Sequence, residues 1–373
     1  MAKFIVAYLL IYSGVHAVVF YRIRVLLPSH GWAIPAVVLF MAAMVVSPLA
    51  SRVLEMQGHD GAARFVAYSA YLWMGFVFLA FSGSILLYLI DFVSWFVRSL
   101  TPLSFPRFSG KTSAAGLLLL SLVLVIYGYF NAKIITFDHL TLYTEKIRDH
   151  KENLRVVHIS DVHLGIINRE TILRKIVEKV KSARPDVLVC TGDLVDGSMQ
   201  NLMHLSNMIE AIEPPYGKFA VTGNHEYYAG LDHSLEFMRR SGFRVLRQEV
   251  LTVAETFNIA GVDDGGRLEE VRESGFLKPM KNGLFTVYLK HRPKVPKSSM
   301  GLYDLQLSGH THNGQIFPFN YLVRLEFPRI QGYYTLDKGS ALYVNRGTGT
   351  WGPPIRIGST AEITVIDIKR AVP

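Results

Sequence analysis

Four long runs of apolar residues occupy the first third of the chain, at residues 4–20, 32–49, 65–90 and 114–130. Each is close to the roughly 20 residues that an α-helix needs to cross the hydrocarbon core of a bilayer. As a helix, the third run would be about 39 Å long, so we expect it to tilt or to extend beyond the bilayer. Short polar connectors separate the runs, and residues 91–113 form the last of them. The pattern predicts a region of four transmembrane helices over residues 1–140.

The second part of the chain has a different pattern, in which short β-rich runs alternate with amphipathic helical runs. Apolar residues recur at helical spacing over residues 169–184, and Pro185 ends that run. The predicted strands are residues 154–159, 186–190, 218–221, 284–289, 305–307, 341–345 and 361–368, with two or three more within residues 243–262. Alternation of strands and helices predicts an α/β domain over residues 150–373. In such folds, ligand-binding groups gather where the strands end.

Composition supports this division into two regions. Hydrophobic residues make up 50% of the 373 residues and charged residues 18%, below the roughly 25% charge of an ordinary soluble domain. The first 150 residues carry 11 Lys and Arg and 6 Asp and Glu, and the other 223 carry 28 and 24. Neither part has the dense basic stripe of a nucleic-acid-binding protein, so we expect no nucleic-acid partner. Cys190 is the single cysteine, which excludes an intramolecular disulfide and a thiolate-rich zinc site.

The distribution of basic residues bears on the orientation in the membrane. Four spans place both ends of the helical region on one side. That side has seven Lys and Arg near the spans, and the other side has five. Because cytoplasmic loops carry the excess of Lys and Arg, the count favours a cytoplasmic catalytic domain. A cleaved signal peptide is the alternative for the first run, but no small-residue cleavage site follows it.

Carboxylate, amide and imidazole side chains directly follow the predicted strands: Asp161, His163, Asp193, Asn224, His225, His291, His310 and His312. Asp161 and His163 are two residues apart, so an extended backbone would point both the same way. Nitrogen and oxygen ligands without thiolate favour manganese, iron, zinc or cobalt. The set is large enough for two divalent ions that share Asp193. Two such ions can hold a bridging hydroxide and clamp both oxygens of an in-line phosphoryl displacement.

Taken together in this order, these motifs resemble the calcineurin-like metallophosphoesterase family. The resemblance covers about residues 150–370 and does not extend to the helical region. Residues 343–350 and 353–356 are similar to a membrane-associated bacterial branch of that family. The resemblance implies a sandwich of two mixed β-sheets with helices outside. It also implies that the site lies at the strand ends.

The resemblance further implies roles for individual residues. The first metal ion would be held by Asp161, His163, His312 and Asp193, and the second by Asn224, His291, His310 and the same Asp193. His225 would contact the phosphate or protonate the leaving oxygen instead of binding metal. We interpret Asp196 and Glu226 as residues that orient the ligands. Asn313, which stands where this branch often has glycine, is a candidate substrate contact, together with Arg292 and Arg346.

A segment rich in aromatic and aliphatic residues follows the last histidine motif, at residues 316–334. Two interpretations stay open. The segment packs against the sheet, or it forms an apolar lip in the headgroup region of the membrane. In the second case a lipid-linked phosphate would reach the metals without leaving the bilayer, and Arg292, Lys294 and Lys297 would attract its charge.

These observations predict an integral membrane protein of a bacterial inner membrane that is a metal-dependent phosphoesterase. We expect it to cleave a phosphodiester or pyrophosphate bond in a lipid or lipid-linked substrate, as a UDP-diacylglucosamine pyrophosphatase-like enzyme would. A first alternative is a broad phosphodiesterase for soluble nucleotides that the helices merely tether. A second is an inactive binding or signalling protein, against which the complete ligand set argues. The native metal and the oligomeric state stay open.

Overall fold

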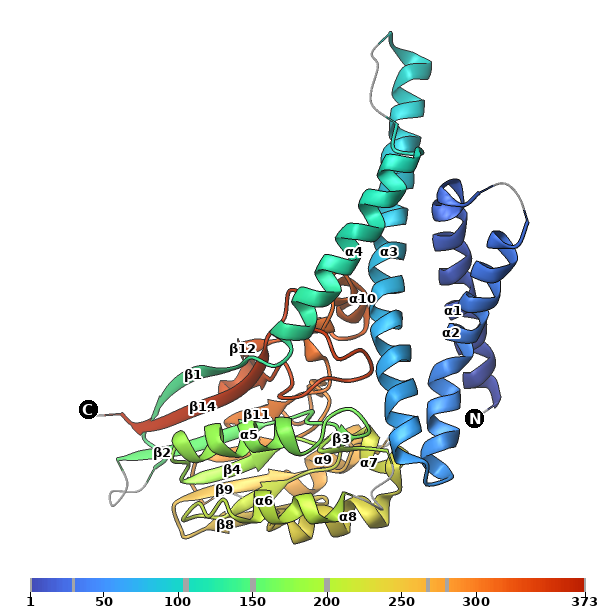
Figure 1. The fold of residues 1–373 in the computed structure, drawn as a ribbon. Helices are drawn as coiled ribbons and strands as arrows, with labels where there is room; N and C mark the ends of the chain where they lie inside the picture. Colours follow the sequence, from blue (N-terminus) through green and yellow to red (C-terminus); the bar gives the residue numbers. More distant parts are fainter. Residues whose placement is uncertain are drawn as a thin grey trace. The chain divides into compact units, whose positions relative to one another are not determined.

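The computed structural model describes residues 2–28, 31–102, 107–147, 152–197, 202–265, 269–278 and 282–371. The chain forms two compact units. A helical unit comprises Met1–Phe130 with Gly352–Ile355, and a catalytic domain comprises Asn131–Trp351 with Arg356–Pro373. Figure 1 shows the helices of the first unit and the strands of the second.

The helical unit contains α1 (Ala2–Ile23), α2 (Ala33–Met56), α3 (Asp60–Leu100) and α4 (Lys111–Asn131). All four are long and apolar enough to cross a membrane, which confirms the four predicted helices. The connector expected at residues 91–113 is much shorter, because α3 continues to Leu100. Asp91, the first residue of the expected connector, lies 3.4 Å from the Arg22 guanidinium and accepts a hydrogen bond from the Phe108 amide.

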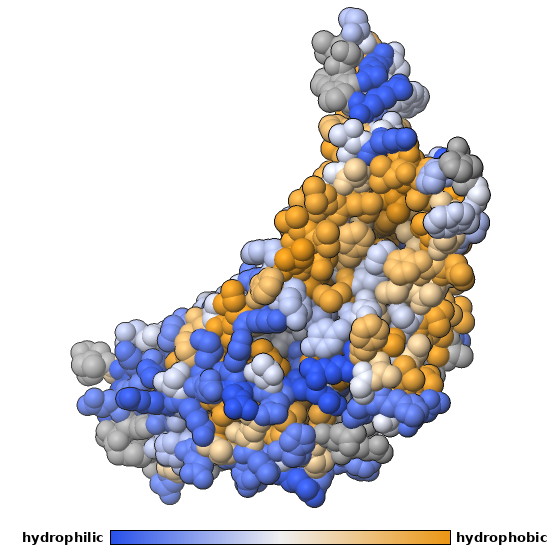
Figure 2. Space-filling view, in the orientation of Figure 1, coloured by the Kyte–Doolittle hydropathy of each residue, from blue (hydrophilic) through white to orange (hydrophobic). Residues whose placement is uncertain are grey.

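Small residues line the buried side of α3. Its buried positions include Ala63, Ala67, Ala70, Gly75 and Ala80, which let neighbouring helices approach closely, as is common in membrane proteins. Large apolar side chains such as Leu86 and Phe92 face outward, although Val77 and Leu79 are buried. Figure 2 shows an apolar surface over the helices.

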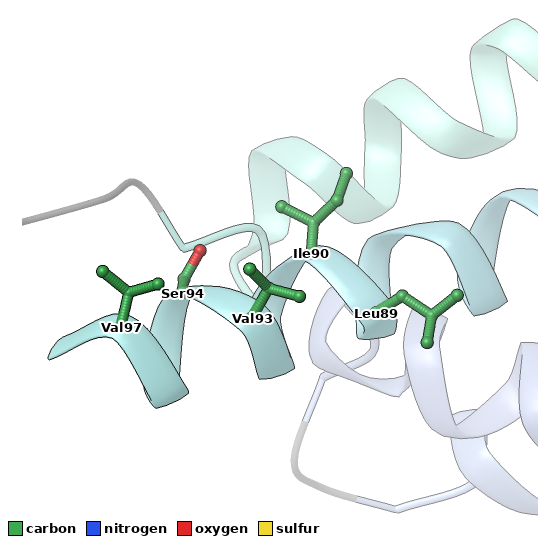
Figure 3. A pocket seen from close by; sticks show the side chains of 5 residues that line it. All are labelled: Leu89, Ile90, Val93, Ser94 and Val97. Carbon is green, nitrogen blue, oxygen red and sulfur yellow. The ribbon is translucent and has the colours of Figure 1, made fainter. Parts of the chain in front are cut away.

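Two apolar hollows lie in the described part of the helical unit. One is lined by Leu89, Ile90, Val93, Ser94 and Val97, all on α3 (Figure 3). The other, of about 780 Å³, lies among side chains of α2, α3 and α4 that include Trp73 and Tyr129. Their linings contain no carboxylate, imidazole or basic group, so neither hollow has the ligands of a metal or phosphate site.

Two six-stranded sheets form the catalytic domain. The first has the order β1 (Ile135–Thr144), β14 (Ala361–Arg370), β2 (Asn153–Ile159), β4 (Val187–Cys190), β6 (Lys218–Ala220) and β7 (Phe243–Val245). The second has the order β12 (Gly332–Thr335), β13 (Ala341–Val344), β11 (Leu305–Ser308), β10 (Thr286–Leu289), β9 (Phe257–Gly261) and β8 (Glu249–Val253). Both sheets are mixed, since β14 pairs antiparallel with β2 and β12 antiparallel with β13. A two-stranded sheet joins β3 (Leu164–Gly165) to β5 (Val195–Asp196).

Alternation along the strands places apolar side chains on both faces of the first sheet. Leu154 and Val156 of β2 pack in one cluster with Leu305 and Leu307 of the second sheet. Val157 and Ile159 face the other way, into a cluster that contains the buried face of a helix. The helices of the domain are α5 (Glu170–Ser182), α6 (Ser206–Glu210), α7 (Asn224–Ala229), α8 (Leu231–Arg240), α9 (Glu269–Leu277) and α10 (Phe319–Glu326). The predicted sandwich with outer helices is confirmed.

The first strand of the domain lies where the sequence analysis placed the boundary between the regions. All ten residues of β1 pair in parallel with β14, from Ile135 opposite Ala361 to Thr144 opposite Arg370. Asn131 donates hydrogen bonds to the backbone carbonyls of Arg356 and Ser359. The compact unit that contains β1 begins at Asn131, and its edge strand pairs with a strand from the other end of the domain.

Candidate metal centre

The predicted ligands lie at the carboxyl ends of parallel strands in both sheets. In the first sheet, β2, β4 and β6 run parallel and lead to Asp161, Asp193 and Asn224. In the second, β10 and β11 run parallel and lead to His291 and His310. Parallel strands present their carboxyl ends along one edge of a sheet. The distances below show that the two edges meet.

The first group of ligands joins Asp161, His163 and His312, all buried, with one candidate ligand atom each within 4.8 Å of the others. The two imidazole Nε2 atoms lie 3.1 Å apart. His312 Nε2 lies 3.4 Å from a carboxylate oxygen of Asp161, and His163 Nε2 lies 4.0 Å from the same oxygen. This arrangement matches the donor set of a divalent transition metal.

The second group of ligands joins Asp193, His291 and His310. His291 Nε2 lies 3.3 Å from Asp193 Oδ2, and His310 Nδ1 lies 3.0 Å from His291 Nε2. Asp193 Oδ2 is also 3.8 Å from His163 Nε2 of the first group. The Asp193 carboxylate therefore lies between the two groups.

A buried hydrogen-bond acceptor without a described partner indicates that these residues suit metal ions. The Asn224 Oδ1 atom is buried and has no hydrogen-bond partner among the described residues. A buried polar atom of this kind normally has a partner. A cation would satisfy an amide oxygen, and α7 carries Asn224 next to His225, whose amide donates to Asp193 Oδ1 at 2.8 Å. The residues present fit two divalent ions.

His310 and His312 are two residues apart, yet their side chains do not point the same way. His310 belongs to the second group and His312 to the first, although an extended chain would point both side chains the same way. The reason is the backbone, since φ is 71° at His310 and 48° at His312. Asp161, His163 and Asp193 have positive φ as well, a conformation that is uncommon outside glycine.

Electrostatics keeps most of the ligands in their metal-binding forms. Burial and the neighbouring His225 lower the pKa of His163 to about 3, and burial and His291 lower the pKa of His310 to about 3. Both imidazoles are therefore neutral. Burial would raise the pKa of Asp193, but the charge of His291 outweighs it and holds this pKa well below its usual range. A neutral imidazole and an ionised carboxylate are the forms that bind cations.

His291 titrates in the opposite direction from His163 and His310. Burial lowers its pKa, yet the charge of Asp193 outweighs burial and raises the pKa of His291 to about 10. Its Nδ1 lies 2.8 Å from the Thr191 carbonyl oxygen, which leaves Nε2 to face Asp193. A cation that binds there would release the proton from Nε2.

His225 lies beside the ligands with a partner of its own. Its ring is edge-on to that of His163, with centroids 4.6 Å apart, and its Nδ1 lies 2.9 Å from a carboxylate oxygen of Asp196. Burial lowers the pKa of His225, but the hydrogen bond with Asp196 and the charge of Asp193 raise it to about 9. With Nδ1 fixed by Asp196, Nε2 is the nitrogen that can reach a substrate.

Glu226 orients the backbone of the site. Its buried carboxylate accepts hydrogen bonds from the amides of Asp193, Leu194, Val195 and Gly223, at 2.6–3.2 Å. These bonds tie the loop after β4 to the loop after β6. The position of the Asp193 carboxylate therefore depends on Glu226.

The three candidate substrate contacts differ in their surroundings. The Arg346 guanidinium pairs with Asp138 at 2.9 Å and with Glu362 at 3.1 Å. These described partners of Arg346 lie on β1 and β14. Arg292 pairs with Asp264 at 3.0 Å and directly follows His291. Asn313 is buried, with φ at 51°, directly after His312.

Arg356 is a site residue whose role the sequence did not reveal. Its side chain is fully buried and donates hydrogen bonds to the backbone carbonyls of Arg346, Gly347 and Gly349. One of its guanidinium nitrogens lies 3.5 Å from His312 Nδ1. Arg356 therefore holds the loop that packs behind His312. Sequence similarity marked residues 353–356, but only the fold brings Arg356 to the histidine.

Comparisons with known proteins agree with this geometry. A family model described as calcineurin-like phosphoesterase matches residues 154–314. An uncharacterized metallophosphoesterase of Aquifex aeolicus is 39% identical over 256 residues, which cover 67% of this chain and 98% of the relative. This chain belongs to the calcineurin-like metallophosphoesterase family. It is therefore a metal-dependent phosphoesterase, and its two groups of ligands suit the two divalent ions that the family uses.

The matches to two further relatives of this metallophosphoesterase cover a similar share of this chain. An uncharacterized metallophosphoesterase of Campylobacter jejuni is 34% identical over 253 residues, 66% of this chain and 67% of the relative. A transmembrane protein with a metallophosphoesterase domain from Danio rerio is 33% identical over 276 residues, 68% of this chain and 62% of the relative. The apolar helices and the membrane relative together indicate that this metallophosphoesterase is associated with a membrane.

Proposed function

We propose that this chain is a membrane-anchored hydrolase that cleaves a phosphodiester or pyrophosphate bond in a lipid or lipid-linked substrate. The observation that carries the proposal is the convergence of two groups of ligands on Asp193, with His225 beside them. One ion would be held by Asp161, His163, His312 and Asp193, and the other by Asn224, His291, His310 and Asp193. The neutral imidazoles of His163 and His310 and the ionised Asp193 carboxylate support the assignment.

His225 is the proton donor in this proposal. The two ions, when bound, supply positive charge that offsets the phosphate and acidifies the attacking water. The His225 imidazole gives the proton on Nε2 to the leaving oxygen as the bond from phosphorus to that oxygen breaks. The hydrogen bond between Nδ1 and Asp196 fixes the ring and favours the protonated form. Arg292, at the edge of the second group, attracts the anionic substrate.

The four apolar helices support the lipid substrate, because they keep the domain at a bilayer surface where lipids are the most concentrated phosphate esters. We further propose a bacterial inner membrane with the catalytic domain in the cytoplasm. The excess of basic residues on the side of the domain supports this orientation.

Replacing His225 by alanine tests the proton-donor role. His225→Ala is expected to lower kcat by about 10²–10⁴-fold while elemental analysis still finds two metal ions per chain. His233→Ala, which removes an exposed histidine of α8, is the matched control and is expected to keep full activity. If His225→Ala lost its metal, the role assigned to His225 would be wrong.

Paired substrates test the substrate class. The detergent-solubilised enzyme, loaded with manganese, is assayed against a lipid-linked pyrophosphate and against a soluble chromogenic diester. A higher kcat/KM for the lipid is the expected result. A higher value for the soluble ester would favour the tethered nucleotide phosphodiesterase, and inactivity on both would exclude the proposed hydrolase.

A further inference from the structure

The helix that follows the histidine motif exposes its apolar side chains. None of the residues of α10 is buried. The large apolar side chains exposed on α10 or just before it, each by 41–83%, are Phe317, Phe319, Tyr321, Leu322 and Leu325. We call these five residues the apolar lip. Contiguous apolar surface of this kind on a folded domain marks an interaction site.

The apolar lip is a single surface. The rings of Phe317 and Tyr321 lie edge to face, with centroids 5.9 Å apart. Leu322 and Leu325 are three residues apart, and Tyr321 and Leu325 are four apart, so these side chains share one face of the helix. The interpretation that this segment packs against the sheet does not apply to α10, because no residue of the helix is buried.

Backbone contacts connect the start of the apolar lip to the turn that carries His312. At its start, Phe319 donates a backbone hydrogen bond to Ile316 and Phe317 donates one to Ile357, both at 2.8 Å. Gly314, in the turn that carries His312, has φ of 73°, and a side chain there would collide with the backbone of Asn320. These contacts make the start of α10 a rigid continuation of the turn at His312.

The end of α10 is tied to the same motif. Phe327 is buried, and its ring lies edge-on to that of His310, with centroids 5.1 Å apart. The Thr311 hydroxyl donates to the Ile330 carbonyl at 2.7 Å. Because both ends of the helix are held, its apolar face is fixed in place despite its exposure.

Basic residues border the lip. Arg324 is exposed on α10 itself. The Lys294 ammonium lies 5.4 Å from the centroid of the Phe327 ring and 3.8 Å from Glu326. Aromatic and aliphatic side chains flanked by Arg and Lys are typical of helices that lie at the lipid–water interface. Anionic headgroups complement these charges.

We propose that the apolar lip inserts into the headgroup region of the bilayer that α1 to α4 span, and so holds the metal centre against that surface. A lipid bilayer is the binding partner because the same chain has four apolar spans and because Arg324 and Lys294 flank the apolar lip. The inference deepens the proposed function and rests on it for the nature of the substrate. A lipid phosphate would then meet the ligands without its acyl chains entering water.

Fluorescence of a labelled full-length chain tests the insertion. The native Cys190 is fully buried, so a thiol-reactive NBD dye added to Leu325→Cys reports on the lip, with unsubstituted protein as the labelling blank. In vesicles of phosphatidylcholine and phosphatidylglycerol, a nitroxide on the acyl chains is expected to quench this dye strongly. The same dye on Arg240→Cys of α8 is the control. Quenching equal to the control overturns the proposal, and so does a blue shift without quenching, which indicates a protein partner.

Charge substitutions test whether the lip serves the reaction. Leu322→Glu and Leu325→Glu are expected to lower the ratio of kcat/KM for a lipid-linked pyrophosphate in vesicles to that for a soluble diester by roughly tenfold. Arg240→Glu on α8 is expected to leave that ratio as it is. Equal losses on both substrates would mean that α10 only supports the metal turn, and the inference would fail. If the unsubstituted enzyme did not hydrolyse the lipid-linked pyrophosphate, the proposed function would fail. The quenching experiment would still show whether the lip lies in the bilayer.

Discussion

Helix α3 of the helical unit and the core of the catalytic domain differ in the size of the side chains that they bury. Along α3 the buried positions are mostly alanine, glycine and serine, while Leu86 and Phe92 point outward. In the domain, large side chains such as Leu154, Phe257 and Leu305 are fully buried between the sheets. The difference follows from the solvent, because lipid tails accept large apolar groups and water excludes them.

The two units also treat polar groups differently. In the helical unit, isolated polar side chains satisfy one another, as when Trp73 Nε1 donates to His16 Nε2 at 2.9 Å. In the domain, carboxylates and imidazoles form a buried cluster that could hold metal ions. Polar substitutions are therefore expected to have their largest effects in that cluster and small effects among the helices.

The sharpest way to break this contrast is to remove the shared carboxylate. Asp193→Ala is expected to lower activity by about a thousandfold, because both groups of ligands lose their common member. Elemental analysis of the purified protein should find less than one metal ion per chain. Asp232→Ala, at an exposed position of α8, is the control. Retention of both ions in Asp193→Ala would show that the carboxylate does not bridge them.

The next largest effect is expected at the residue that positions the bridge. Glu226→Ala leaves four backbone amides without their acceptor, so we expect a loss of about 3 kcal/mol in the free energy of unfolding. Metal affinity should fall by about 10–100-fold. Denaturant unfolding and metal titration measure the two effects, with Glu236→Ala, at a partly exposed position of α8, as reference. Normal metal affinity in Glu226→Ala would remove Glu226 from the support of the site.

A smaller effect is expected in the helical unit. Trp73→Phe deletes the hydrogen bond to His16 and should reduce stability in detergent by about 0.6 kcal/mol. Metal content and activity on a soluble diester should not change. Trp95→Phe, at an outward-facing position, serves as the comparison. A loss of several kcal/mol would show that polar contacts dominate this unit after all.

The smallest effect is expected at the surface of the domain. The hydrogen bonds from Arg155 outweigh burial and lower the pKa of Asp367. A lowered pKa stabilises the folded state at pH values above the pKa of the unfolded state, which is about 4. This stabilisation is lost as the pH falls through the pKa of the folded state. Asp367→Asn should thus cost about 0.4 kcal/mol at pH 7, and the variant and the parent should converge in acid. A difference that persists in strong acid would exclude an ion-pair origin.

The sequence predicted most of the catalytic domain because its strands are short buried runs and its ligands follow them directly. The helical spans were equally visible in their apolar length. By contrast, the sequence did not predict β1, because its residues are only half apolar and the strand forms by pairing with β14. The continuation of α3 past Asp91 depends on a partner in another helix. Arg356 acquires its role through backbone carbonyls that lie close together only in the fold.

Five of the seven candidate ligands, namely Asp161, His163, Asp193, His310 and His312, have left-handed backbone. Such residues cost the native state free energy that glycine would not. These positions nevertheless carry ligand side chains, which glycine lacks. The candidate metal centre is thus a place where the function of a residue, and not its contribution to folding, determines which residue the chain carries.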